Sequence, residues 1–134
     1  MLMAGDEVVI TQTYTDYVRA FHTLDPQAIL PYCHVPCMFI SSQGVRVMTT
    51  PAELEDFLTR MMAGLKARGY ARSEITDLQV KQMSDHVAFL SVSRVRYTTD
   101  GQELERLGET YTLRKTDDGW KIVVATVHDP HTIC

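Results

Sequence analysis

Two hairpins marked by glycine join three long predicted strands in the last third of the sequence. The strands cover residues 87–98, 103–115 and 120–127, and the turns contain Asp100-Gly101 and Asp118-Gly119. Strands in globular proteins average about five or six residues. Strands much longer than that form a tall, strongly twisted antiparallel sheet that can curl around a cavity.

Helical periodicity dominates the first half of the sequence. Apolar residues recur at three- and four-residue spacing over residues 7–23, and again after Thr50-Pro51, where an N-cap and a proline at the first helical position mark a helix start. The remaining predicted elements are a short helix at 26–30 and strands at 35–41, 45–48 and 75–83. Helices that precede an antiparallel meander predict an α+β fold, in which the N-terminal helices close a curved, mostly antiparallel sheet.

The composition fits one domain spanning residues 1–134, with a hydrophobic fraction of 45%. No apolar run approaches the ~20 residues that cross a bilayer. The N-terminus lacks the basic stretch and apolar core of a signal peptide. We therefore expect a cytoplasmic protein without a membrane partner. Thirteen basic and seventeen acidic residues give a net charge of −4 with no basic cluster, which argues against a nucleic-acid partner.

Cysteine and histidine gather once, in Cys33-His34-Val35-Pro36-Cys37. Zinc needs four ligands, and the further candidates are distant in the sequence, namely His128, His131 and Cys134. Because this ligand pattern is incomplete, we expect no metal site, and no motif points to another cofactor.

Counting residues through the hairpins predicts which side chains share a face of the sheet. If each Asp-Gly forms a two-residue turn, Val92 faces Glu109, and Glu109 faces His128. One face then carries an apolar end and a polar end, the latter with Arg94, Glu109, Tyr111, Thr126 and His128. A hollow of this kind is typical of small-molecule sites. The other face is flat, small and β-branched, and is suited to pack against a second copy of the chain; it carries Phe89, Ser91, Ser93, Val95, Thr110, Thr112, Val123, Ala125 and Val127.

Three segments resemble the nuclear transport factor 2-like superfamily, and within it the SnoaL-like group. They are residues 14–17, residues 24–30 and residues 108–123, the last containing Gly119-Trp120-Lys121-Ile122 at the opening of the final strand. The resemblance implies a conical fold with an internal pocket and, for many members, a homodimer. Members include a ketosteroid isomerase, a scytalone dehydratase, polyketide cyclases and proteins that only bind partners, so the fold does not decide the function.

Three residues are candidates for acid–base catalysis. His128 could act as a base oriented by Glu109, or the two could be a polar pair at a sheet edge. The Tyr14 hydroxyl could stabilise an oxyanion, or it could be a core group that bonds to the backbone.

Ligand-binding candidates complete the predicted site: Tyr17, Tyr111, Thr126, Arg94, Phe57 and Met61. Arg94 and Arg96 are expected to pair with Glu105 and Glu109 across the hairpin, although Arg94 could instead hold a ligand carboxylate.

Two functions are compatible with this pattern. The first is a homodimer that binds a small apolar or aromatic molecule in the pocket. The second is an acid–base enzyme of the isomerase, dehydratase or cyclase type that acts on a lipophilic ring. The isomerase version lacks its aspartate base, since Phe39, Ile40 and Ser41 occupy that region. A protein-interaction module is a third possibility and would expose a large apolar patch.

Overall fold

The computed structural model describes residues 5–130. Within that range the elements follow in this order: α1 (Glu7–Phe21), α2 (Pro26–Ile29), a single 3₁₀ turn (Leu30–Tyr32), β1 (Cys33–Ser41), β2 (Gly44–Met48), α3 (Pro51–Ala67), β3 (Tyr70–Gln82), β4 (Val87–Thr98), β5 (Glu103–Thr116) and β6 (Gly119–His128). The α+β prediction is confirmed, and β4 has the predicted bounds. The strand predicted at 75–83 begins earlier, at Tyr70, because two irregularities in its pairing with β4 interrupt the alternation that marks a strand.

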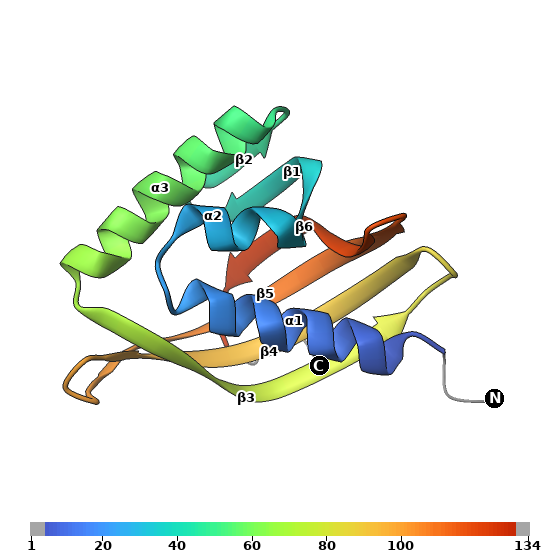
Figure 1. Cartoon of the computed structure of the whole chain (residues 1–134). Helices are drawn as coiled ribbons and strands as arrows, with labels where there is room; N and C mark the ends of the chain where they lie inside the picture. The colour runs from blue at the N-terminus through green and yellow to red at the C-terminus, as the bar shows by residue number, and fades with distance from the viewer. Residues whose placement is uncertain (1–4, 131–134) are drawn as a thin grey trace.

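The six strands of this range form one sheet in the order β2-β1-β6-β5-β4-β3, in which only β1 and β6 run parallel. Figure 1 shows the helices gathered on one side of this curved sheet, so that the sheet has a concave face under the helices and a convex face away from them. None of the helices in residues 5–130 is both long and apolar enough to cross a membrane.

Each of the long helices buries the stripe that its spacing predicts. On α1 the buried side chains are Ile10, Tyr14, Tyr17, Val18 and Phe21. On α3 they are Leu54, Leu58, Met62 and Leu65, and the Thr50 hydroxyl accepts a hydrogen bond from the Glu53 amide at 3.2 Å to cap the helix.

The N-terminus of α1 is tied to the last hairpin through Asp6. Its side chain makes no cap bond to the helix. Instead, the carboxylate accepts hydrogen bonds from Lys115 Nζ at 2.7 Å and from Trp120 Nε1 at 3.2 Å. The hydrogen bond from Lys115 is the main reason that the pKa of Asp6 lies below its usual value. This contact therefore connects the start of α1 to the β5–β6 hairpin.

The first hairpin has the predicted register. Val92 pairs with Glu109 and Leu90 with Tyr111. The loop, however, has three residues, 99–101, rather than the predicted two. This change alone would move each side chain of β5 to the opposite face of the sheet. A bulge at Leu104 reverses them again, so the two irregularities cancel.

The second hairpin does not have the predicted register. Its turn is Asp117-Asp118, and Val123 forms a bulge between the Leu113–Ile122 and Thr112–Val124 pairs. Beyond that bulge, Glu109 pairs with Val127, and His128 pairs with Gly108. The prediction that His128 and Thr126 share the concave face with Glu109 is therefore wrong, because one extra residue turns the rest of β6 over.

Gly108 gives a direct test of this register. A Cβ at Gly108 would lie 2.6 Å from His128 Cε1 and 2.9 Å from the Asp129 carbonyl oxygen. We expect Gly108→Ala to reduce the free energy of unfolding by about 1–3 kcal/mol in urea titrations, because the site has no room for a methyl group.

The control for this variant is Gly64→Ala on α3, where an added Cβ meets nothing within 4 Å. It should be neutral or stabilise by about 0.5–1 kcal/mol, since alanine favours a helix. Removing the imidazole as well, in Gly108→Ala/His128→Ala, should recover part of the loss. If Gly108→Ala is neutral, the observed pairing of β5 with β6 is wrong.

Candidate functional site

A cavity of about 450 Å³ lies between α3 and the concave face of the sheet. Its apolar wall comes mainly from α3, β1 and β2, and includes Phe39, Met48, Leu54, Phe57, Leu58 and Met61. The Phe39 and Phe57 rings meet with centroids 5.1 Å apart. The helical stripe therefore has two functions: part of it fills the core, and Phe57 and Met61, which are only half-buried, face the cavity.

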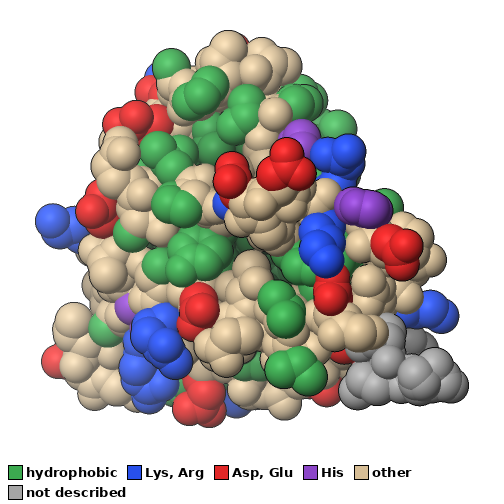
Figure 2. All heavy atoms as spheres, turned by 45° about the vertical axis from the view of Figure 1, so that its right-hand side comes forward, with side chains coloured by type: hydrophobic (Ala, Val, Ile, Leu, Met, Phe, Trp, Pro, Cys, Tyr) green, Lys and Arg blue, Asp and Glu red, His purple; other side chains and the backbone are tan. Residues whose placement is uncertain are grey.

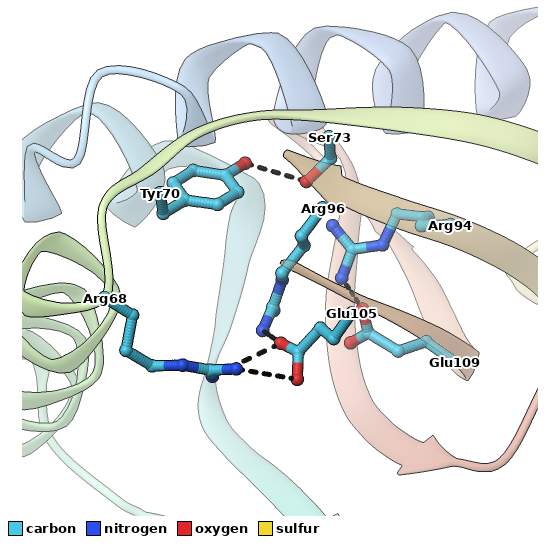
Figure 3. Close-up of polar contacts among 7 residues, drawn as sticks. All are labelled: Arg68, Tyr70, Ser73, Arg94, Arg96, Glu105 and Glu109. Carbon is cyan, nitrogen blue, oxygen red and sulfur yellow. Dashed lines mark hydrogen bonds and ion pairs between the residues drawn. The ribbon is translucent and has the colours of Figure 1, made fainter. Parts of the chain in front are cut away.

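The opposite wall is polar and comes from β4, β5 and the end of α3. Its charged members are Arg68, Arg94, Arg96, Glu105 and Glu109. Arg94 and Arg96 lie two residues apart on β4 and therefore point to the same face, and Figure 3 shows both side chains leaving the strand on one side. The predicted pairing across the hairpin is confirmed: Arg94 forms an ion pair with Glu109, and Arg96 forms one with Glu105.

The Arg94–Glu109 pair is almost completely buried, with side-chain exposures of 3% and 5%. Burying two charges costs several kcal/mol for each ion, and their mutual attraction offsets this only while both are present. Tyr14, Tyr17 and Tyr111 surround Arg94 closely enough to affect it electrostatically. The pair is thus the polar centre of an otherwise aromatic region.

Glu105 lies between two arginines and connects α3 to the sheet. Arg96 Nη1 donates to its carboxylate at 2.6 Å, and Arg68 Nη2 donates at 3.2 Å (Figure 3). Partial burial opposes ionisation of Glu105, but the hydrogen bonds from Arg96 and Arg68 prevail and hold the pKa of its carboxyl below the usual value. Glu105 is therefore a carboxylate at neutral pH.

The predicted site residues fall into three groups. Tyr17, Arg94, Glu109, Phe57 and Met61 line the cavity as expected. The second group, Tyr14 and Tyr111, is buried beside the cavity rather than in its wall, with the Tyr14 hydroxyl donating to that of Tyr111 at 3.4 Å.

Thr126 and His128 form the third group, on the convex face. They pair with Thr110 and Gly108 respectively. The imidazole of His128 lies against Gly108, and its Nδ1 is 2.7 Å from the Asp129 carbonyl oxygen. The predicted base and its orienting carboxylate are therefore on opposite sides of the sheet.

Sequence reasoning missed Arg68 as a member of the site. The signal was present, since Arg68 follows Leu65 by three residues and Met61 by seven, and so continues the stripe of α3 that faces the cavity.

Cys33 and Cys37 also line the cavity. Burial raises the pKa of the Cys33 thiol to about 12, and burial likewise raises that of Cys37, so both are protonated at neutral pH and are poor nucleophiles. No cluster of His, Cys, Asp or Glu within residues 5–130 is arranged to hold a metal ion. His131 and Cys134 lie outside the described residues.

The surface gives no further charged site on the face seen in Figure 2. Acidic and basic side chains are interspersed there, with hydrophobic side chains between them. This face does not gather one sign of charge.

The chain matches a described protein family over most of its length. Residues 6–130 match the family described as NTF2-like protein (DUF6841), and the chain belongs to that family. No curated protein matches it. The NTF2-like part of the predicted resemblance is confirmed, together with the cone-shaped α+β fold.

Solved structures share the fold at low sequence identity. An NTF2-like protein of unknown function from Pseudomonas putida KT2440 superposes with a TM-score of 0.79 at 12% identity, over 99% of this chain and 92% of that one. An NTF2-like protein with a cystatin-like fold from Novosphingobium aromaticivorans gives 0.76 at 15% identity, over 95% and 83%. A protein of unknown function with a cystatin-like fold from Nostoc punctiforme gives 0.76 at 14% identity, over 97% and 96%.

The buried ion pair leads to a stability prediction. We expect Glu109→Ala to lower the free energy of unfolding by about 3–5 kcal/mol, because Arg94 would remain charged and buried without its partner. The double variant Arg94→Met/Glu109→Leu should lose less than Glu109→Ala does, since no charge remains to be compensated. Urea unfolding of the single and double variants measures both. A double variant that loses as much stability as Glu109→Ala, or more, would mean that the buried charge of Arg94 does not depend on Glu109.

Proposed function

We propose that the chain binds a small, largely apolar or aromatic molecule in the cavity under α3. The observation that carries this proposal is the cavity itself. Its volume of about 450 Å³ falls in the range of roughly 300–1,000 Å³ that is usual for small-molecule sites. An apolar wall that faces a few converging polar groups is also the usual composition of such sites.

The acid–base alternative has weaker support. It relied on His128 as the base, and that imidazole lies on the convex face. Glu109 remains at the cavity but is held by Arg94. Tyr17 also lines the cavity, and burial keeps the pKa of its hydroxyl far above the usual value, so the hydroxyl stays protonated at neutral pH. The cavity is therefore better equipped to hold a molecule than to remove a proton from one.

A cavity-filling substitution tests binding. N-phenyl-1-naphthylamine, a neutral apolar dye, should bind the unaltered protein with enhanced fluorescence and one site per chain. Met61→Trp should weaken this binding by about tenfold or more, because the indole occupies the space of the ligand.

Thr59→Trp is the matched control, since Thr59 lies on the same helix but is exposed. It should leave the affinity for the dye unchanged. Circular dichroism and thermal unfolding should confirm that both variants are folded. Equal dye binding by the unaltered protein and Met61→Trp would reject the cavity as the site.

We further propose that the protein is a homodimer in which the convex faces of two sheets meet. In the described range the helices lie on the other face of the sheet, and the convex face presents half-buried side chains in its middle strands: Phe89, Ser91, Thr110, Thr112, Val124 and Thr126. The predicted face contained Val123, Ala125 and Val127 of β6. Because of the bulge at Val123, Val124 and Thr126 lie on this face instead. Most of these side chains are small, and a smooth surface of this kind is compatible with a two-fold contact.

Val124→Glu tests the dimer. The unaltered protein should sediment with twice the mass of the chain, and Val124→Glu should sediment with the mass of one chain, because the contact would bury unpaired carboxylates. Thr59→Glu, on the exposed side of α3, is the control and should remain dimeric. A single-chain mass for the unaltered protein would contradict this proposal.

A further inference from the structure

The polar wall of the cavity carries an excess of positive charge. The wall contains three arginines and two glutamates. No other described residue that lines the cavity carries a formal charge. Both carboxylates are already engaged, Glu109 by Arg94 and Glu105 by Arg96 and Arg68. The polar wall is therefore electrostatically suited to an anionic group rather than to a cationic one.

Two of the arginines also have hydrogen-bonding capacity that the protein does not use. Arg94 Nε and Arg96 Nε are buried, and neither has a hydrogen-bond partner among the described residues. A buried N–H without an acceptor costs free energy, and native proteins rarely leave one without a partner, water or ligand. The two guanidinium groups leave β4 on the same side, and both residues line the cavity (Figure 3).

We propose that the ligand carries a carboxylate and that Arg94 and Arg96 receive it. This proposal rests on the cavity being a small-molecule site, as proposed above. The planar fork of a guanidinium matches the two oxygens of a carboxylate, and the charge strengthens each hydrogen bond. A carboxylate would neutralise the excess charge and supply acceptors for the free donors at the same time.

The apolar end of the cavity defines the rest of the ligand. Phe39, Met48 and Phe57 lie towards β1 and β2, away from the arginines of β4. A molecule that places its carboxylate at Arg94 and Arg96 would extend its other end along α3 towards these rings. The ligand class is therefore an amphipathic carboxylic acid with an aromatic or branched aliphatic body.

Matched acid and amide probes test this inference. We would titrate the unaltered protein by calorimetry with 2-naphthoate and 2-naphthamide, and with 3-phenylpropionate and 3-phenylpropionamide. Each pair differs in charge but hardly in shape. The acids should bind about tenfold more tightly than their amides, the gain expected from hydrogen bonds to a charged acceptor. Arg96→Gln should abolish most of this preference, whereas Arg60→Gln, an exposed arginine of α3, should preserve it.

The outcomes separate the two proposals. If acid and amide bind equally, and Met61→Trp weakens both, the cavity binds small molecules but the carboxylate inference is wrong. If the preference survives in Arg96→Gln, the assignment to Arg96 is wrong. If no probe binds, both the small-molecule site and the carboxylate inference are rejected. If Arg96→Gln does not fold, the comparison of acid with amide on the unaltered protein still decides whether the cavity prefers a carboxylate.

Discussion

The ion pair between Arg94 and Glu109 fixes how the rest of the structure is arranged. The two residues lie diagonally across β4 and β5, since Arg94 pairs with Leu107 and Glu109 with Val92. Both must face the same side for the charges to meet. A slip of one residue between these strands would move one charge to the other face and leave its partner buried alone, which costs several kcal/mol. The pair therefore locks the register of the two central strands and places a polar centre in the concave face.

A second set of charges holds α3 over that face. Arg68 follows the last residue of α3 and reaches Glu105 on β5, which Arg96 also holds. Closer to its middle, the helix contacts β1 through the Phe57 and Phe39 rings. The cavity lies beneath the helix, which lines it from Leu54 to Leu65. The same arginines that support the helix therefore also form the wall that a ligand would touch, so that stability and binding share residues.

Much of the fold could be predicted from the sequence, because its signals are local. The cap at Thr50, the stripe on α1 and the bounds of β4 follow from spacing and residue type. The site was less predictable, because it depends on how many residues each bulge adds. The bulge at Leu104 cancelled an unexpected loop length, whereas the bulge at Val123 had nothing to cancel it. Val123 has no unusual residue type, so nothing in the sequence marks the point at which His128 turns away from Glu109.

The position of β6 in the sheet has a consequence for how the protein is made. β6 is the last strand in chain order among residues 5–130, yet it lies between β1 and β5 and is the only link between the β1–β2 hairpin and the rest of the sheet. During synthesis on the ribosome, that hairpin stays unpaired along one edge until residues 119–128 have emerged. Unpaired strand edges promote aggregation, and long-range pairing slows folding. The two parts of the sheet can therefore join only after residues 119–128 have been synthesised.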